Sequence, residues 1–308
     1  MHSRVATPDD LAQLISLLDD IFRRGKGVHD QSVLSDFPLL FDESHLHHCR
    51  VIEHDGQLLS HAAVWPRQMI VDGNPIEVGI IVLVATVEHA RRQGLAGRLM
   101  KELQAELAQS GCQVGLLWTG VPGFYEPLGW RVVEAPGWSA CQPAQATAAG
   151  SAIDSSLTRV DYEPGRHRTA IVNLHRQCSV HVNRTPAEWT QLLDLPKCLV
   201  HVGERDGQAV AYLVDGQATN KRGLCEYGGV SEDVWQLVRS LPASPEPRRL
   251  TIFPTHTGLR DLAQSAGWKI SNLVSSKGFG VEMQLVLDRS LDGPGLLDRL
   301  FCWGLDQA

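Results

Sequence analysis

Apolar residues recur at helical spacing at the start of the chain. This pattern predicts a helix over residues 8–24 that begins near Asp9 or Asp10, which can cap it. The apolar positions that define it are Leu11, Leu14, Ile15, Leu18 and Ile21. A second short helix is expected over residues 32–40.

The pattern then changes to that of β-strands. Strands are expected over residues 49–52 and 58–65, joined at Asp55-Gly56, a dipeptide that favours tight hairpin turns. A further turn is expected at residues 72–75. Residues 80–84 are continuously apolar and mostly β-branched, which is typical of a strand buried on both faces.

A helix is predicted directly after this strand, with Gly111 as its natural end. Its apolar stripe consists of Leu95, Leu99, Leu103 and Leu107. A strand over residues 114–119, a short helical or turn segment over 122–128 and a strand over 130–133 are expected to follow.

The composition shifts towards Ala, Gln, Pro, Ser and Gly over residues 135–156, which indicates a linker. A last strand over residues 138–142 followed by a shorter linker fits the same stretch. We therefore place the boundary near residue 150 and expect domains at 1–150 and 151–308.

The second half repeats the order of the first: hairpin, strand, helix, strand, helix, strand. Helices over residues 168–182 and 185–193 are expected to precede this series. Its members are predicted at residues 197–205, 208–214, 224–230, 232–241, 249–254, 259–266, 268–273 and 281–287. The repetition indicates an internal duplication of a mixed-sheet α/β (α+β) unit.

Charge and composition narrow the functional classes. The chain of 308 residues has 28 Lys and Arg against 35 Asp and Glu, a net charge of −7, which disfavours nucleic acid as a partner. No run of about 18 apolar residues predicts a membrane span, and the N-terminus lacks a signal-peptide pattern. We expect a cytoplasmic protein without a membrane partner.

Cysteine and histidine spacing gives no metal site. The seven cysteines are scattered and none form a C-x-x-C pair, so neither zinc nor a disulfide framework is expected. His45, His47, His48 and Cys49 are close in sequence, but no second ligand pair follows at zinc spacing. We interpret them as an exposed segment before a strand.

The most informative segment is the buried strand that leads into Arg91-Arg92-Gln93-Gly94-Leu95-Ala96-Gly97 and a helix. Gly94 lets the chain turn and lets a ligand approach the backbone. Amides at the start of the helix, at the positive end of its dipole, can bind a pyrophosphate, and Arg91 and Arg92 add positive charge. From this fragment alone an ordinary strand-to-helix turn remains an equal alternative.

Two motifs resemble the GNAT acyltransferases. Residues 84–96 resemble the family's motif A, with Arg/Gln-x-x-Gly-x-Gly/Ala after a buried strand, and Phe124-Tyr125-Glu126-Pro127-Leu128-Gly129-Trp130 resembles its second signature. The spacing also fits, so residues 3–145 resemble one complete GNAT domain. Glu88 departs from the family's usual Pro, and Ala96 replaces the second Gly.

The resemblance implies acyl-CoA, most simply acetyl-CoA, as co-substrate and no metal. It implies that backbone groups of Val84, Ala85 and Thr86 pair with the pantetheine arm, and that Arg91, Arg92, Gln93, Gly94, Leu95, Ala96 and Gly97 cradle the pyrophosphate. Tyr125 would be the general acid that protonates the leaving thiolate; the alternative is a packing role.

The base and the acceptor site are less defined. Glu77 and His61 are the candidate bases, each acting through a water, and a partly deprotonated amine is the alternative. Trp65 and Arg67 follow the strand that borders the acceptor site in this family, although core packing also explains them. The acceptor is expected to be a primary amine on a small molecule or peptide.

The second half has the shape of the first without its phosphate loop. Residues 226–232 contain no Arg or Lys and include two acids, so we expect a GNAT-like domain that binds no CoA. Tandem proteins of the enhanced-intracellular-survival type have this arrangement and add a sterol-carrier-like domain. We expect no such domain before Ala308 and carry over no role for its carboxylate.

Three functions therefore remain open. The leading one is an N-acetyltransferase with Tyr125 as general acid. The second is an inactive CoA-binding regulatory or scaffold protein, and the third a structural chain with no CoA site. The amphipathic segment at residues 296–303 can dock on the second domain or form a homo-oligomer interface.

Overall fold

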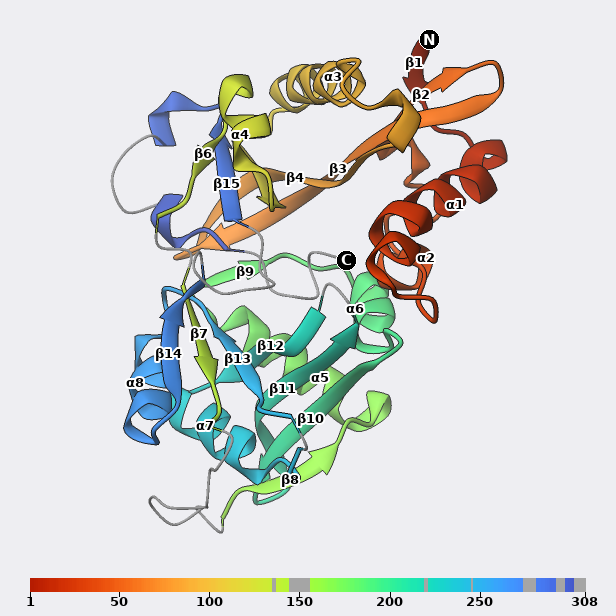
Figure 1. The fold of residues 1–308 in the computed structure, drawn as a ribbon. Helices are drawn as coiled ribbons and strands as arrows, with labels where there is room; N and C mark the ends of the chain where they lie inside the picture. Colours follow the sequence, from red (N-terminus) through yellow and green to blue (C-terminus); the bar gives the residue numbers. More distant parts are fainter. Residues whose placement is uncertain are drawn as a thin grey trace.

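The computed structural model describes residues 1–134, 137–143, 156–218, 221–244, 246–273, 281–291 and 297–301. Within them, two mixed sheets lie one above the other (Figure 1). The first contains β1 (His2–Val5), β2 (Cys49–His54), β3 (Gln57–Val71), β4 (Asn74–Thr86), β5 (Val114–Thr119), β15 (Val281–Val286) and β6 (Arg131–Val132), in this spatial order, with β9 (Val180–Val182) beside β3. The mixed-sheet α/β fold class is confirmed.

The second sheet has the order β14 (Lys269–Asn272), β7 (Trp138–Cys141), β13 (Arg249–Ile252), β12 (Lys221–Gly229), β11 (Gln208–Ala218), β10 (Cys198–Arg205) and β8 (Thr158–Asp161). The helices are α1 (Leu11–Phe22), α2 (Val33–Asp36), α3 (Leu95–Gln109), α4 (Pro122–Tyr125), α5 (Pro164–Arg176), α6 (Pro186–Leu193), α7 (Ser231–Ser240) and α8 (Thr257–Ser265). The repeated order of hairpin, strand, helix, strand, helix and strand is present in both halves.

The predicted hairpin turns form because their central residues accept left-handed backbone conformations. Asp55 and Gly56 have φ angles of 50° and 75°, and Asp206 and Gly207 have 52° and 75°. Positive φ at both positions is the geometry of the turn that matches the twist of paired strands. The turn at residues 72–73 has the same form.

Helix α3 covers one face of the first sheet (Figure 1) and buries the predicted leucine stripe. The helix approaches β4 closely at Gly79. A Cβ atom on that residue would lie only 2.0 Å from Cδ2 of Leu107. A glycine in this strand therefore lets α3 pack directly on the sheet.

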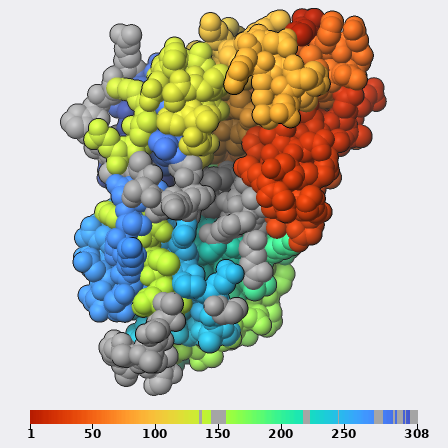
Figure 2. All heavy atoms as spheres, in the orientation of Figure 1, coloured from red at the N-terminus to blue at the C-terminus, as the bar shows by residue number. Residues whose placement is uncertain are grey.

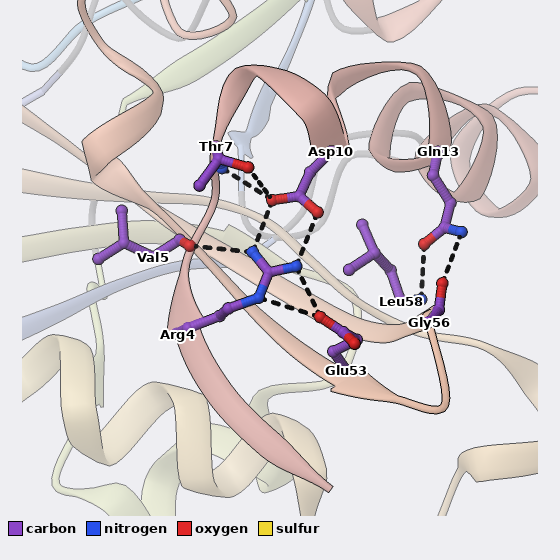
Figure 3. Close-up of polar contacts among 8 residues, drawn as sticks. All are labelled: Arg4, Val5, Thr7, Asp10, Gln13, Glu53, Gly56 and Leu58. Atoms are coloured by element: carbon purple, nitrogen blue, oxygen red, sulfur yellow. Dashed lines mark hydrogen bonds and ion pairs between the residues drawn. The ribbon is translucent and has the colours of Figure 1, made fainter.

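Polar contacts fix the N-terminal strand and α1 to the β2–β3 hairpin (Figure 3). The Arg4 guanidinium donates to Asp10 at 2.6 Å and to Glu53 at 2.7 Å. Hydrogen bonding from Arg4 lowers the pKa of Asp10 to about 2. The Gln13 side chain accepts from the Leu58 amide at 2.7 Å. These contacts hold α1 next to the edge of the sheet.

Three strands pair outside their own half of the chain: β7, β15 and, as described in the next paragraph, β9. Strand β15, from the end of the chain, inserts between β5 and β6 in the first sheet, and β7 joins β13 and β14 in the second (Figure 1). Both were predicted as strands, but the sequence pattern assigned each to the sheet of its own half. Residues 144–155, which include the expected boundary, lie outside the described residues.

A further strand corrects the helix predicted over residues 168–182. Helix α5 ends at Arg176, and β9 pairs with Met69, Ile70 and Val71 of β3. Strand β2 pairs with β3 only as far as Ala63, so the far end of β3 offers a free edge there. The β-branched valines of β9 suit that edge, which local periodicity does not reveal.

The two halves also meet through α1, α2 and the chain that follows α6. In Figure 2 the atoms of α1 and α2 reach the second half. An ion pair of 2.6 Å joins Asp30, between these helices, to Lys197. Phe301, near the end of the described chain, stacks on Phe253 with ring centroids 4.1 Å apart. Phe301 thus docks on the second half, one of the two roles considered for this segment, while Trp303 and Ala308 lie outside the described residues.

Candidate active site

Strands β4 and β5 separate part-way along their length. Their parallel pairing includes three residue pairs, the last of them between Ile80 and Leu116. Both strands continue, to Thr86 and Thr119, without further pairing between their described residues. The β5-facing backbone edge of residues 81–86 therefore lacks a strand partner and offers peptide groups to an extended ligand.

A β-bulge lies in the separated part of β4. Leu83 has a φ of 53°, which is unusual for a residue with a large side chain, and the register with β3 shifts between His61 and Ala63. The Leu83 carbonyl accepts from Nδ1 of His61 at 2.8 Å. The bulge thus turns this carbonyl towards β3 and away from the regular ladder.

His61 is fully buried and neutral. Because a carbonyl only accepts, Nδ1 carries the proton, and burial lowers the pKa of the ring to about 4. Its Nε2 has no hydrogen-bond partner within the described residues. His61 therefore presents a lone pair beside the bulge, and it is a weak base.

The three residues expected to pair with pantetheine lie at the end of β4. Ser60 on β3 donates to the Ala85 carbonyl at 2.8 Å and contacts the Thr86 hydroxyl at 2.9 Å. Val84 packs against the cluster beneath α3. These contacts fix β4 from the β3 side, and its other edge faces the opening between β4 and β5.

The loop after β4 has the geometry of an anion site. Gly94 precedes α3 with a φ of 78°, and Arg92 also has a positive φ, of 62°. No side chain caps the start of α3, so its first amides point away from the helix unpaired by a side chain. Arg91 donates to the Thr86 carbonyl at 3.2 Å, which holds its cationic side chain at the end of β4.

The remaining residues of this loop are placed as follows. Gln93 is exposed and donates to the His89 carbonyl at 3.3 Å. Leu95 is buried in the core, while Ala96 and Gly97 are half-buried in the first turn of α3. A Cβ atom on Gly97 would meet no atom within 4 Å, so the surface above this turn is open.

Tyr125 lies at the open end of the same separation. It closes the short helix α4, and its hydroxyl interacts with Thr119, the last residue of β5. Its ring contacts Phe124 edge-on with centroids 4.7 Å apart. Burial raises the pKa of Tyr125, which the Thr119 hydrogen bond only partly opposes. The phenol is therefore protonated at neutral pH and can act as a proton donor.

Glu77 lies at the other end of β4. It precedes the paired segment that begins at Val78, and its carboxylate accepts from Gln68 at 2.8 Å. The separated part of β4 starts four residues later, about 13 Å along the strand. The structure therefore brings His61 and Tyr125 to the open end and leaves Glu77 at the closed end.

Trp65 and Arg67 are both buried on β3. The Trp65 ring meets His45 edge-on with centroids 5.0 Å apart, and the guanidinium of Arg67 lies 5.6 Å from its centroid. Arg67 also forms an ion pair with Glu188 of α6. Arg67 thus connects the candidate acceptor strand with the second half of the chain.

The histidine cluster before β2 is not the exposed segment expected from the sequence: His45 and His48 are half-buried against Trp65, and Cys49 is fully buried. His48 also meets this ring edge-on, at 5.9 Å between centroids, and burial lowers its pKa to about 4. Among the described residues, no group of three or more His, Cys, Asp or Glu side chains is placed to hold a metal ion. No helix in the described part of the chain has the length and apolar character needed to cross a membrane.

One ionisable group of this sheet was missed by the sequence analysis. Glu282 on β15 is buried beside Trp118 of β5. Burial raises the pKa of its carboxyl to about 8, against smaller opposing effects of the Trp118 and Gln284 side chains. Its position 164 residues after Trp118 explains the omission, because only the strand exchange brings the two together.

Replacing Glu282 with glutamine is expected to stabilise the fold increasingly as the pH rises from 4.5 to about 8. In this window the unfolded chain releases a proton that the folded protein keeps, so the wild type loses stability. The difference between the two free energies of unfolding should grow by at most about 1.4 kcal/mol per pH unit. Urea unfolding of both proteins near pH 5 and pH 8 measures it; a constant difference would contradict the burial of this carboxyl.

The second half contains a filled counterpart of the separation. Strands β12 and β13 are parallel and pair at Leu224 and Leu250. Beyond this pair, Tyr227 of β12 meets His256 edge-on with centroids 5.1 Å apart, and Phe301 stacks on Phe253. Aromatic side chains of the protein itself therefore occupy this end of the second sheet.

Comparison with known proteins agrees with this geometry. Residues 2–133 match the family model of the acetyltransferase (GNAT) domain. The fold is similar to a GCN5-related N-acetyltransferase from Kribbella flavida, with 14% identity and a TM-score of 0.66 over 93% of this chain and 71% of that one. It is also similar to a probable N-acyltransferase from Enterococcus faecalis V583, with 15% identity and a TM-score of 0.69 over 93% and 72%.

Eis1 from Mycobacterium abscessus is a further similar structure, with 13% identity and a TM-score of 0.61 over 94% of this chain and 74% of that one. At such identities these likenesses show the fold. The family match covers residues 2–133, and the chain as a whole shares the fold of these structures, with two mixed sheets that are consistent with two GNAT-like domains in tandem. The resemblance found in the sequence is thereby confirmed.

Proposed function

We propose that the protein transfers an acetyl group from acetyl-CoA to a primary amine. The observation that carries this proposal is the convergence of three features at one end of β4. They are the free backbone edge of residues 81–86, the uncapped start of α3 and the buried phenol of Tyr125. The free edge suits the extended pantetheine arm of CoA, the start of α3 suits its pyrophosphate, and the phenol suits the thiolate that leaves.

The proposed binding mode follows from these groups. The amides at the start of α3 and the Arg91 and Arg92 side chains bind the pyrophosphate of CoA. The backbone of Val84, Ala85 and Thr86 pairs with the pantetheine amides on the edge that faces β5. This places the thioester at the opening between β4 and β5, close to Tyr125.

The chemical step is a direct attack of the amine on the thioester carbonyl carbon. A backbone amide of β4 stabilises the tetrahedral oxyanion that forms. The C–S bond then breaks, and the thiolate takes the phenolic proton of Tyr125. The nitrogen of the new amide returns a proton to the phenolate, so Tyr125 ends the cycle unchanged.

We assign the acceptor to the face of the first sheet that carries Trp65 and Arg67. His61, on the same strand, offers Nε2 as a hydrogen-bond acceptor to the incoming amine. In this proposal residues 1–150 form the catalytic domain, and residues 151–308 form a second domain that closes the acceptor site. The filled end of the second sheet supports a second domain without CoA.

The first test is calorimetric titration of acetyl-CoA into the purified full chain, with desulfo-CoA and ATP as comparison ligands. We expect one site per chain, and then acetyl transfer to at least one member of a panel of primary amines. Binding without transfer to any amine would favour a CoA-binding regulatory or scaffold protein. No binding would overturn the proposal.

Arg67→Met tests whether Arg67 acts on the acceptor or only joins the two halves. Loss of the ion pair with Glu188 is expected to destabilise the protein by about 2 kcal/mol, because the half-buried Glu188 carboxylate loses its charged partner. If Arg67 also borders the acceptor site, KM for the amine rises while the Kd for acetyl-CoA stays constant. Thermal unfolding and steady-state kinetics separate the two effects, and Glu188→Gln is the matched variant on the opposite side of the contact.

A further inference from the structure

One face of the first sheet presents a row of side chains that crosses four strands. Cross-strand pairing aligns Trp65 of β3 with Ile80 of β4, Ile80 with Leu116 of β5, and Leu116 with Gln284 of β15. The first three belong to the core cluster that includes α1, α2 and the second half of the chain. The row therefore lies on the face opposite α3.

Glu282 lies on this same face, one step closer to the open end. Its neighbour Met283 belongs to the cluster beneath α3, and successive side chains of a strand point to opposite faces. Glu282 pairs with Trp118, two residues beyond Leu116, where β5 has already separated from β4. Glu282 therefore lies one strand beyond β5, beside the part of β5 that has separated from β4, and His61 lies on β3 next to the separated part of β4.

The surroundings of Glu282 leave its carboxyl only partly satisfied. Oε1 has no hydrogen-bond partner within the described part of the chain, although the side chain is buried. The groups that act on its protonation are the side chains of Trp118 and Gln284, which do not titrate. Arg131, on the neighbouring strand β6 opposite Gln284, is exposed. A buried oxygen without a partner is costly unless a ligand supplies the missing donor.

We propose that Glu282 is a catalytic residue that binds the protonated amine of the acceptor and removes its proton before attack. This inference rests on the proposed acetyl transfer. An ammonium group donates to Oε1, which supplies the missing hydrogen bond. The acceptor is then a compound with a cationic primary amine, and the catalytic base comes from the second half of the chain through the exchanged strand.

The proton balance is complete without a further reactant. The Glu282 carboxylate takes one proton from the ammonium, and the free amine attacks the thioester. The C–S bond breaks, Tyr125 protonates the thiolate, and the nitrogen returns its remaining extra proton to Tyr125. Glu282 then releases its proton to solvent, so each turnover yields the amide, CoA and one proton.

The buried carboxyl, with its pKa of about 8, must ionise before it can act. The wild-type kcat/KM should therefore rise about tenfold per pH unit below pH 8 and level off above it. Glu282→Gln should lower kcat/KM at pH 8 by about 100-fold or more, within the usual range for a lost general base. In this variant, the increase of kcat/KM with pH should instead follow the deprotonation of the acceptor amine in solution.

Glu282→Asp and Asp288→Asn serve as comparison variants. The aspartate variant keeps a carboxyl, so its kcat/KM should still rise with pH, but to a lower plateau than in the wild type. Asp288, just beyond the end of β15, contacts Gln113 at 3.3 Å, and its substitution should leave kcat/KM unchanged. Thermal unfolding and acetyl-CoA titration show whether each variant is folded and loaded.

The outcomes separate this inference from the proposed function. Wild-type transfer together with an unchanged rate and pH profile in Glu282→Gln overturns the role of Glu282 and leaves the acetyltransferase intact. Loss of transfer with acetyl-CoA affinity retained supports it. Absence of acetyl-CoA binding in the wild type overturns the proposed function itself.

Discussion

Tyr125→Phe is expected to lower kcat by a factor of about 10²–10⁴, the usual contribution of a general acid. The variant keeps the ring that packs on Phe124 and Trp130 and loses only the hydroxyl at Thr119. The affinity for acetyl-CoA should therefore stay the same, and the loss of stability should be about 1 kcal/mol. Steady-state kinetics and calorimetric titration on the same preparation measure both quantities.

The pH profile gives this experiment a second readout. Because burial raises the pKa of Tyr125, the acid is active below a pKa that lies above the ordinary tyrosine value of 10. The wild-type rate should decline only above that value, and the variant should lack this decline. Tyr162→Phe is the matched control, because its hydroxyl contacts Arg168 in the second half. A wild-type kcat in Tyr125→Phe would mean that Tyr125 is not the general acid and serves only in packing.

Most of the local elements could be predicted because their signals are local. The leucine stripe of α3, the Asp-Gly turns and the apolar run of β4 each require only neighbouring residues to be recognised. The candidate phosphate loop and Tyr125 belong to continuous motifs, so the sequence alone was enough to propose them as site residues. Their placement at one end of β4 follows from the parallel β4–α3–β5 connection.

Long-range pairing is what the sequence could not supply. The exchange of β7 and β15 depends on which free edges the finished sheets offer, and no local periodicity encodes such a choice. The same holds for β9. Its residues fall within the helix predicted over 168–182, and only the free edge of β3 makes them a strand. Glu282 was missed for this reason, whereas Glu77, an acid next to the motif in sequence, lies at the closed end of β4.

Gly97→Glu is expected to weaken acetyl-CoA binding by about 100-fold. A Cβ at this position meets no atom within 4 Å, and its φ is outside the left-handed region, so the fold should accept a side chain. The new carboxylate would extend from the first turn of α3, where the pyrophosphate is proposed to bind. Two like charges about 5 Å apart near a protein surface repel by about 3 kcal/mol, which corresponds to that loss.

Two substitutions at the same position separate charge from bulk. Gly97→Gln has nearly the same shape as the glutamate and should weaken binding far less, because it lacks the charge. Gly97→Ala should stabilise α3 by up to about 1 kcal/mol, since alanine is the better helix former. Calorimetric titration of acetyl-CoA at low and high salt compares the affinities of the glutamate, glutamine and alanine variants. The loss of affinity in Gly97→Glu should become smaller at high salt, because salt screens the repulsion between the carboxylate and the pyrophosphate. Equal affinities for glutamate and glutamine variants would mean that the pyrophosphate lies elsewhere, and the phosphate loop would then be a structural turn.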